Sequence, residues 1–211
     1  SSNQIVSTSN NESLLSVILG FQFLVLFFIE TGSLVEYEDT KWGYLILLEE
    51  QRIIGFLSFY KFNINYEDFK IRISQMVINP NFQNKGFGSK LLESFYNKYL
   101  NTKECKQISV EDPNDSFIFL QFKLFFQMLP IIFKKCKEAN LDEIIIANKH
   151  LINNKEFENI IKIFSREFKS NKVIIENLIG FYMFYLYQKD NRKIDFITLI
   201  RNRLIGQIEI S

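Results

Sequence analysis

The stretch that most constrains this chain is IRISQMVINPNFQNKGFG, from Ile71 to Gly88. It begins with an apolar run rich in β-branched residues, which predicts a buried strand. The strand is expected to end at Asn79-Pro80, because proline cannot donate a hydrogen bond to a neighbouring strand and disfavours helix in the residue before it. A glycine-containing loop follows, and after it apolar residues recur at helical spacing.

This order of strand, glycine loop and helix predicts a phosphate-binding site, because loop amides and the helix dipole favour an anion there. The spacing excludes two common forms of such a site. The P-loop pattern GxxxxGK[ST] is absent, and the dinucleotide pattern GxGxxG would need glycine at Leu91. The remaining pattern is Q-x-x-G-x-G, for which an ordinary tight turn is an equally good interpretation.

The loop and its flanks resemble a known enzyme family. Q-x-x-G-x-G after a strand resembles the pyrophosphate arm of the GNAT superfamily of acetyl-CoA-dependent N-acetyltransferases. Four further segments are similar to the catalytic subunit of the type B histone acetyltransferase, and they occur in the same order at compatible spacing. These segments are Phe28–Thr31, Trp42–Tyr44, Ser74–Ile78 and Val110–Asn114.

The composition describes a folded protein with 47% hydrophobic and 23% charged residues. The 211 residues suffice for one sizeable domain and a smaller appendage. A net charge of +1 gives no global reason to expect nucleic acid or a membrane as a partner. Two isolated cysteines indicate a reduced intracellular compartment rather than a disulfide framework.

The single histidine, His150, limits the available chemistry. It lies in a polar stretch typical of a surface, and no Cys-x-x-Cys or paired-histidine pattern for zinc is present. We therefore expect no metal, and catalysis by carboxylates, tyrosine, lysine or backbone groups.

The N-terminal region divides into a polar tip and an apolar segment. Residues 1–12 are rich in Ser and Asn and are expected to form a disordered tip. Leu14–Ile29 is apolar, but it is short for a membrane span, is interrupted by Gly20 and Gln22, and has no basic residue before it. A buried helix running into a strand near Phe27–Val35 is the favoured interpretation.

Residues 13–129 are expected to form one domain of the α/β (α+β) class. Strands predicted without intervening helices indicate an antiparallel meander, and a strand–helix–strand crossover follows it. The result is a mixed, mostly antiparallel sheet with flanking helices, consistent with the GNAT fold. The predicted strands are Tyr44–Leu48, Ile53–Phe62, Ile71–Asn79 and Gln107–Glu111, and the crossover helix is Phe87–Leu100.

Residues 130–211 are expected to form a small C-terminal helical bundle, because apolar residues recur at helical spacing. The predicted helices from Ser116 onward are Ser116–Met128, Ile131–Ala139, Leu141–Leu151, Lys155–Phe168, Lys172–Gln188 and Arg192–Ile208.

The resemblance implies transfer of acetyl from acetyl-CoA to a lysine of the histone H4 N-terminal tail, by direct attack in a ternary complex. A lysine amine has a reference pKa near 10.4, so it needs a general base. From the residues alone, Glu111–Asn114 is better explained as the N-cap of the next helix. The resemblance instead implies that Glu111 is the base, and that Asp112 and Glu30 hold and deprotonate the lysine.

The resemblance also places acetyl-CoA along the central strand and loop. Backbone groups of Met76, Val77 and Ile78 would hold the pantetheine arm, with an N–H near Val77 meeting the thioester carbonyl. The residues alone are equally consistent with a plain core strand. Pyrophosphate contacts are implied for Gln83, Asn84, Lys85, Gly86, Phe87, Gly88 and Ser89, and later CoA contacts for Asn114 and Lys123.

For the peptide, the resemblance implies a path across Trp42, Tyr60, Lys61 and Phe62, where aromatic rings can line the lysine stem. The acidic stretch Glu36–Asp39 would attract a basic tail. A WD-repeat histone-binding chaperone is the implied protein partner, without direct contact to nucleic acid or membrane. The implied location is the nucleus and cytoplasm.

The match is good from about Phe21 to Gln121 and weak afterwards. The resemblance implies an N-terminal domain that forms one wall of the histone groove, but only about twenty residues precede the match here, so we expect that the sequence is either truncated or has lost that wall. Phe87 stands where the family usually has histidine. Two alternatives stay open. One is a GNAT enzyme with a different amine acceptor, and the other is a truncated, non-catalytic module that binds acetyl-CoA or a partner.

Overall fold

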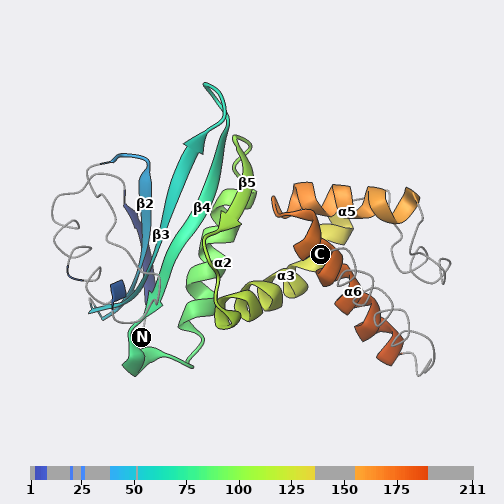
Figure 1. Ribbon diagram of the computed structural model, residues 1–211. Coiled ribbons are helices and arrows are strands. Elements are labelled where there is room, and N and C mark those ends of the chain that lie inside the picture. Colours follow the sequence, from blue (N-terminus) through green and yellow to red (C-terminus); the bar gives the residue numbers. More distant parts are fainter. Residues whose placement is uncertain are drawn as a thin grey trace. The chain divides into compact units, whose positions relative to one another are not determined.

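The computed structural model describes residues 3–8, 20, 25–26, 39–50, 52–135 and 155–189. The chain forms two compact units: the first comprises Ser1–Leu124 and Arg166–Ser170, and the second comprises Phe125–Ser165 and Asn171–Ser211. The sheet belongs to the first unit (Figure 1).

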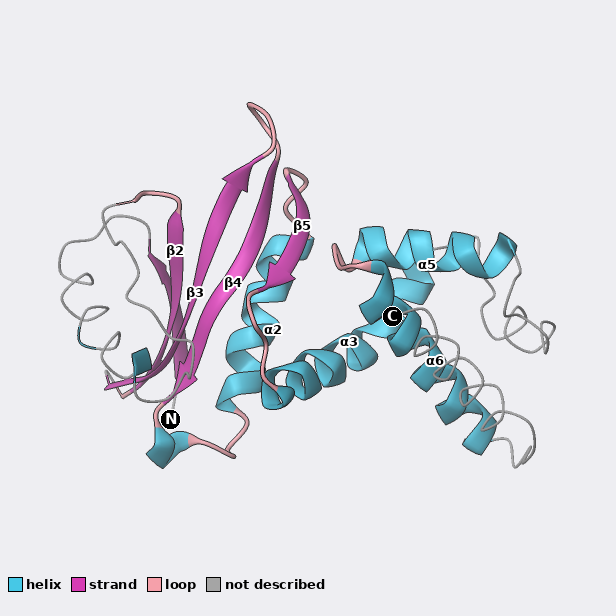
Figure 2. Ribbon diagram, in the orientation of Figure 1, coloured by secondary structure: helices cyan, strands magenta, loops and turns pink. Residues whose placement is uncertain are grey.

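The sheet has five strands in the order β1-β2-β3-β4-β5 (Figure 2). The pairs from β1 to β4 are antiparallel, and β4 pairs with β5 in parallel. The expected meander and crossover are therefore confirmed, as is a mixed, mostly antiparallel sheet with flanking helices. The strands are Asn3–Thr8 (β1), Trp42–Glu49 (β2), Arg52–Asn63 (β3), Phe69–Ile78 (β4) and Cys105–Val110 (β5).

The first strand corrects the expectation of a disordered N-terminal tip. Asn3–Thr8 form β1, which pairs with β2 from Asn3 opposite Glu49 to Thr8 opposite Tyr44. The edge of β2 offers a row of backbone donors and acceptors, and these bind another strand whatever its side chains are. Polar composition alone therefore did not exclude a strand here.

The crossover from β4 to β5 begins with a 3-10 turn, η1 (Pro80–Phe82), and continues as helix α2 (Phe87–Leu100). The Asn79 side chain accepts a hydrogen bond from the Asn81 amide, and Pro80 fits the first helical position because it needs no donor there. The bounds predicted for α2 are confirmed.

Aromatic packing joins α2 to one face of the sheet. The Phe59 ring lies edge-on to Phe95 at 5.3 Å and to Tyr99 at 5.2 Å between centroids. Phe59 pairs across the strands with Gly43. A Cβ atom at Gly43 would lie only 2.3 Å from Cζ of Phe59, so this packing requires glycine.

The opposite face of the sheet has its own apolar cluster. Val25, from the N-terminal region, packs there against residues of β2, β3 and β4, and all members are buried. Trp42, Leu48 and Ile53 pack against its margin. The buried members are Val25, Tyr44, Ile46, Phe56 and Val77.

Helix α3 (Asp115–Lys135) corrects the prediction of two helices separated at Pro130. A proline inside a helix removes one backbone hydrogen bond and crowds the preceding turn, which is why a break was expected. The helix nevertheless continues, with Leu129 and Ile132 buried on either side of Pro130. Burial of these side chains offsets the lost bond.

Two further helices are described, α5 (Lys155–Glu167) and α6 (Lys172–Lys189), as predicted within a few residues. The division between the compact units falls within α3, after Leu124, and not at the expected residue 130. The helices predicted at 141–151 and 192–208 lie outside the described residues, as does the strand predicted near 27–35.

One described stretch, Asp115–Ile132 of α3, is long and apolar enough to cross a membrane. Core helices of soluble proteins meet the same criterion, so this property assigns no membrane role.

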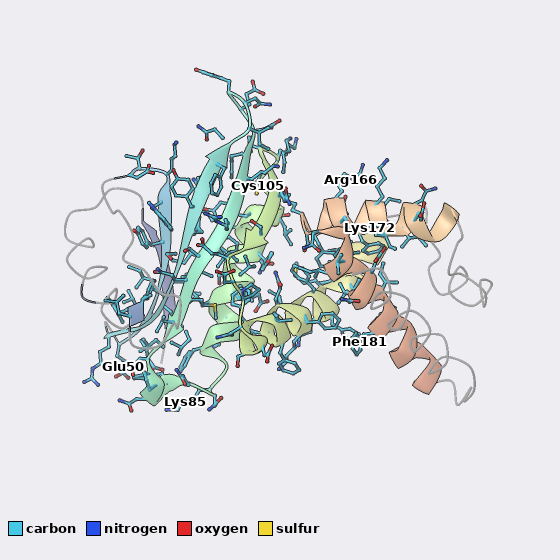
Figure 3. All side chains as sticks on the ribbon, viewed as in Figure 1. Glu50, Lys85, Cys105, Arg166, Lys172 and Phe181 are labelled. Carbon is cyan, nitrogen blue, oxygen red and sulfur yellow. The ribbon has the colours of Figure 1, made fainter. Side chains whose placement is uncertain are left out.

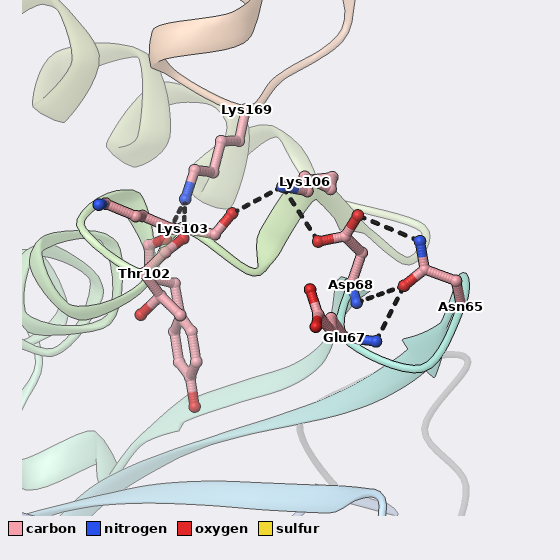
Figure 4. Close-up of polar contacts among 8 residues, drawn as sticks. Asn65, Glu67, Asp68, Thr102, Lys103, Lys106 and Lys169 are labelled. Carbon is pink, nitrogen blue, oxygen red and sulfur yellow. Dashed lines mark hydrogen bonds and ion pairs between the residues drawn. The ribbon is translucent and has the colours of Figure 1, made fainter.

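Residues 166–170 are part of the first unit through contacts with β5 and α2. The Ile108 amide donates to the Lys169 carbonyl at 2.7 Å. The Lys169 ammonium donates to the carbonyls of Tyr99 and Thr102, each at 2.6 Å, and so caps the end of α2 (Figure 4). Nearby, Lys106 and Asp68 form an ion pair of 3.0 Å that ties β5 to the loop after β3.

Candidate active site

The loop before α2 has the geometry of an anion site. Asn84 and Gly86 have positive φ angles of 60° and 81°, which turn the chain sharply into the helix. Among the residues that the structure describes, no side chain caps the N-terminus of α2 and none in its first turn is acidic. The first amides of α2 are therefore available to a negatively charged group, and the helix dipole favours one.

Side chains fix the shape of this loop. Gln83 donates to the Ile78 carbonyl at 2.9 Å, and the Lys85 ammonium donates to the Asn81 carbonyl at 3.0 Å. Lys85 lies at the lower end of the first unit, away from Cys105 (Figure 3). A Cβ atom at Gly88 would come within 3.2 Å of Cε of Met76, so glycine lets α2 approach β4 closely. These features fit the pyrophosphate of acetyl-CoA.

The adjacent part of β4 has an open edge. The pairing of β4 with β5 runs from Phe69 to Ile73, while β4 itself continues to Ile78. Within the described strands, residues 75 to 78 are thus paired on the β3 side only. Met76, Val77 and Ile78 lie in this stretch, so their edge can accept an extended group as an added strand. The pantetheine arm of acetyl-CoA is such a group.

Glu111 stands where β4 and β5 separate. Its amide donates to the Ile73 carbonyl at 2.9 Å. Oε2 of its carboxylate accepts a 2.6 Å hydrogen bond from the Ser74 hydroxyl, and Oε1 lies 3.6 Å from Nη2 of Arg72. The side chain of Glu111 is 40% exposed, so a substrate amine can reach it. This geometry suits a general base that is held in place yet accessible.

The residues after Glu111 form the turn into α3. Asp112 is exposed and has a positive φ of 36°. The side chain of Asn114 accepts a hydrogen bond from the Phe117 amide at 2.9 Å, so Asn114 caps α3. The helix-cap interpretation is thus correct for Asn114. Lys123 lies exposed on α3, in the same unit.

Three aromatic residues form a strip on the sheet face opposite α2. The rings of Trp42 and Tyr60 lie edge to face with 5.1 Å between their centroids, and the rings of Tyr60 and Phe62 do so with 4.7 Å between theirs. The Arg72 guanidinium lies 5.0 Å from the centroid of the Phe62 ring and also forms an ion pair with Glu111. Arg72 thus links the aromatic strip to Glu111. The strip can line the methylene stem of a lysine.

An acidic residue anchors the strip. The Tyr60 hydroxyl donates a 2.8 Å hydrogen bond to Oδ2 of Asp39. The Lys41 amide also donates to this carboxylate, and the two bonds lower the pKa of Asp39. Asp39 is therefore negatively charged at neutral pH, beside a surface proposed to take a basic peptide.

Lys61 lies apart from the strip, although it was predicted with it. Successive strand residues face opposite sides of a sheet, and the Lys61 ammonium lies 5.5 Å from the Phe69 ring on the α2 side. Burial, together with the charge of Lys98, lowers the pKa of Lys61. Burial also raises the pKa of the nearby Cys105 thiol. A peptide on the aromatic strip would thus not contact Lys61.

Glu30, the third predicted carboxylate, lies outside the described residues. Among those described, no group of three or more His, Cys, Asp and Glu side chains could hold a metal ion.

Arg72 and Ser74 are the site residues that the sequence did not reveal. Each contacts Glu111 from the neighbouring strand, at a distance of many residues along the chain. Arg72 and Ser74 are two residues apart in a predicted strand, and this spacing predicts that they lie on the same face of it. The neighbouring predicted strand ends at Glu111, and this was the sequence feature that could have identified them.

Residues 18–118 match the family described as Acetyltransferase (GNAT) family. The histone acetyltransferase type B catalytic subunit of Candida albicans is 33% identical over 114 residues, covering 46% of this chain and 28% of that protein. Its counterpart from Rattus norvegicus is 29% identical over 108 residues, covering 47% and 26%. The chain thus spans 26% to 28% of the length of these curated relatives.

Among solved structures, an aminoglycoside acetyltransferase from an uncultured soil metagenomic sample, in complex with sisomicin, matches with a TM-score of 0.44. The two chains are 19% identical, and the match covers 57% of this chain and 84% of the other.

Proposed function

From the match of residues 18–118 to the Acetyltransferase (GNAT) family, we propose that the protein transfers acetyl from acetyl-CoA to the ε-amine of a lysine in the histone H4 N-terminal tail. The observation that carries this proposal is the position of Glu111. Its carboxylate stands where β5 ends and the open edge of β4 begins, beside the predicted acetyl-CoA site. Similarity to type B catalytic subunits supports a histone as the acceptor.

Different residues of the chain bind different parts of acetyl-CoA. Backbone groups of Met76–Ile78 hold the extended arm of acetyl-CoA, and the uncapped amides at the start of α2 bind its pyrophosphate. Bound there, acetyl-CoA supplies the acetyl thioester. A backbone N–H near Val77 hydrogen-bonds the carbonyl oxygen that becomes negatively charged during attack. Asn114 and Lys123 contact the remaining part of CoA.

Glu111 accepts a proton from the lysine ammonium, and the neutral amine then attacks the thioester carbonyl. Holding a lysine amine neutral near pH 7.4 costs on the order of 4 kcal/mol, because its reference pKa is near 10.4. An ammonium has no lone pair, so the carboxylate must accept its proton before the attack can occur. When the tetrahedral intermediate collapses, the C–S bond breaks, and CoA leaves as a thiolate that takes up the proton lost by the attacking nitrogen. Asp112 and Glu30 assist by holding the lysine, and the aromatic strip binds its methylene stem.

The peptide crosses the sheet along Trp42, Tyr60 and Phe62, with Asp39 attracting its basic residues. We further propose a WD-repeat histone-binding chaperone as a partner, and the nucleus and cytoplasm as the location. The resemblance of the sequence motifs to the type B catalytic subunit implies both.

The test is acetyl transfer to an H4 tail peptide, compared with other lysine peptides and with small amines. Preferential acetylation of the H4 peptide supports the proposal. Transfer to small amines but not to the H4 peptide would replace it with a GNAT enzyme of different acceptor. Binding of acetyl-CoA without transfer to any acceptor would favour a non-catalytic module.

A further inference from the structure

Ser74 occupies an irregular position in β4. The pairing of β3 with β4 runs from Ser58 opposite Gln75 directly to Phe59 opposite Ile73, so Ser74 is an extra residue without a register partner on β3. Such a bulge bends the strand and re-aims the side chain at that position. In this structure the re-aimed hydroxyl points at the Glu111 carboxylate.

Three contacts from β4 hold Glu111, and they differ in strength. The hydrogen bond from the Glu111 amide to the Ile73 carbonyl fixes the position of the Glu111 backbone. The Ser74 hydroxyl donates to Oε2 of the Glu111 side chain at 2.6 Å. A short O–H···O⁻ bond is among the stronger hydrogen bonds in proteins. Arg72 lies 3.6 Å from Oε1, and both side chains are about two-fifths exposed, so this ion pair contributes little. Ser74 therefore provides the main side-chain contact.

Arg72 is itself held by the aromatic strip. Its guanidinium lies against the Phe62 ring at 5.0 Å. Arg72 and Ser74 are two residues apart on one strand, so they reach Glu111 from the same face. The carboxylate thus has a defined orientation between the acetyl-CoA edge of β4 and the aromatic strip.

We propose that Ser74 is a positioning residue for Glu111, with Arg72 as a supporting contact. This inference rests on the proposed function. By binding Oε2, Ser74 fixes the carboxylate rotamer and leaves Oε1 to accept the proton of the amine. Without the hydroxyl the carboxylate can rotate away from the attacking amine, and small misplacements of a catalytic group are costly.

The experiment measures kcat and KM for Ser74→Ala, Ser74→Thr and the matched control Ser109→Ala. Ser109 is a sheet serine whose hydroxyl donates to the Ile71 carbonyl at 3.3 Å and does not touch Glu111. We expect Ser74→Ala to lower kcat about tenfold with both KM values unchanged. Ser74→Thr should restore most of kcat, because threonine keeps the hydroxyl, and Ser109→Ala should match the wild type. Equal melting temperatures establish that all variants fold.

A double mutant separates positioning from other roles. In a Glu111→Gln background, Ser74→Ala should lower kcat no further, because the group it positions is already gone. A wild-type kcat in Ser74→Ala would overturn the inference while leaving the proposed function intact. The same tenfold loss in the Glu111→Gln background would also overturn it. Absence of transfer by the wild type would overturn the proposed function and this inference together.

Discussion

The amide of Glu111 donates a 2.9 Å hydrogen bond to the carbonyl of Ile73, at the point where the pairing of β5 with β4 ends. This one contact sets the layout of the candidate site. On one side of it the two strands are paired, and beyond it β4 continues with an open edge towards the glycine loop. Glu111 is thereby fixed next to the edge proposed to bind acetyl-CoA.

Gly86→Ala should weaken acetyl-CoA binding. Gly86 has a φ of 81°, and a Cβ atom there meets nothing within 4 Å, so the only expected cost is backbone strain. That strain should destabilise the fold by about 1 kcal/mol and tilt the loop amides. We expect a Kd for acetyl-CoA about 3- to 10-fold higher, measured by calorimetry.

The matched control is Gly180→Ala in α6, where an added Cβ also meets nothing within 4 Å. This variant should raise stability by about 0.5–1 kcal/mol, because alanine favours a helix interior over glycine. Its acetyl-CoA affinity should not change. If both variants bind acetyl-CoA like the wild type, the loop is not the pyrophosphate site.

Tyr60→Phe should weaken peptide binding alone. It removes the 2.8 Å bond to Asp39, which holds the Tyr60 ring against Trp42. The lost bond is worth about 1 kcal/mol, so KM for the peptide should rise roughly fivefold while KM for acetyl-CoA stays unchanged. Tyr66→Phe, at an exposed position beyond β3, is the control. An unchanged peptide KM in Tyr60→Phe would remove the aromatic strip from the peptide path.

Tyr44→Phe should change the alkaline stability of the protein. Burial raises the pKa of Tyr44 from 10.0 to about 12, and its buried hydroxyl has no hydrogen-bond partner among the residues that the structure describes. A group whose folded pKa is raised contributes stability that is present below the unfolded pKa and is lost as pH rises through the folded value. The free energy of unfolding that Tyr44 contributes should therefore begin to fall near pH 10, and the loss should reach about 1 kcal/mol near pH 11.

Urea unfolding near pH 8 and near pH 11 measures this effect. The phenylalanine variant should be at least as stable as the wild type near pH 8, because it removes an unpaired polar group. It should also lose less stability between the two pH values. Identical losses in both proteins would show that Tyr44 does not titrate with a raised pKa.

Much of the fold follows from local patterns. Alternating and β-branched apolar residues predicted β2, β3 and β4, and the glycine loop and apolar spacing predicted the bounds of α2. Two features, β1 and the continuation of α3 through Pro130, were not predicted, for physical reasons. β1 pairs with the backbone edge of β2, and such pairing does not require an apolar sequence. α3 continues through Pro130 because residues on both sides of it are buried.

The candidate site was predictable only in part. Glu111 and the loop residues stand in sequence motifs, so the family resemblance identified them. The contacts of Glu111 with Ser74 and Arg72 depend on the register in which β4 pairs with β5 and on the bulge at Ser74, neither of which the local sequence specifies. Lys61 stands between two members of the aromatic strip in sequence but faces the other side of the sheet.

The most direct test of the account compares the wild type with Glu111→Gln in acetyl transfer to the H4 tail peptide, and measures acetyl-CoA affinity for both. The amide keeps the shape of the side chain but cannot accept the proton. We expect kcat to fall by roughly two or more orders of magnitude while Kd for acetyl-CoA stays within about twofold. A variant that turns over as fast as the wild type would contradict the central claim that Glu111 is the general base.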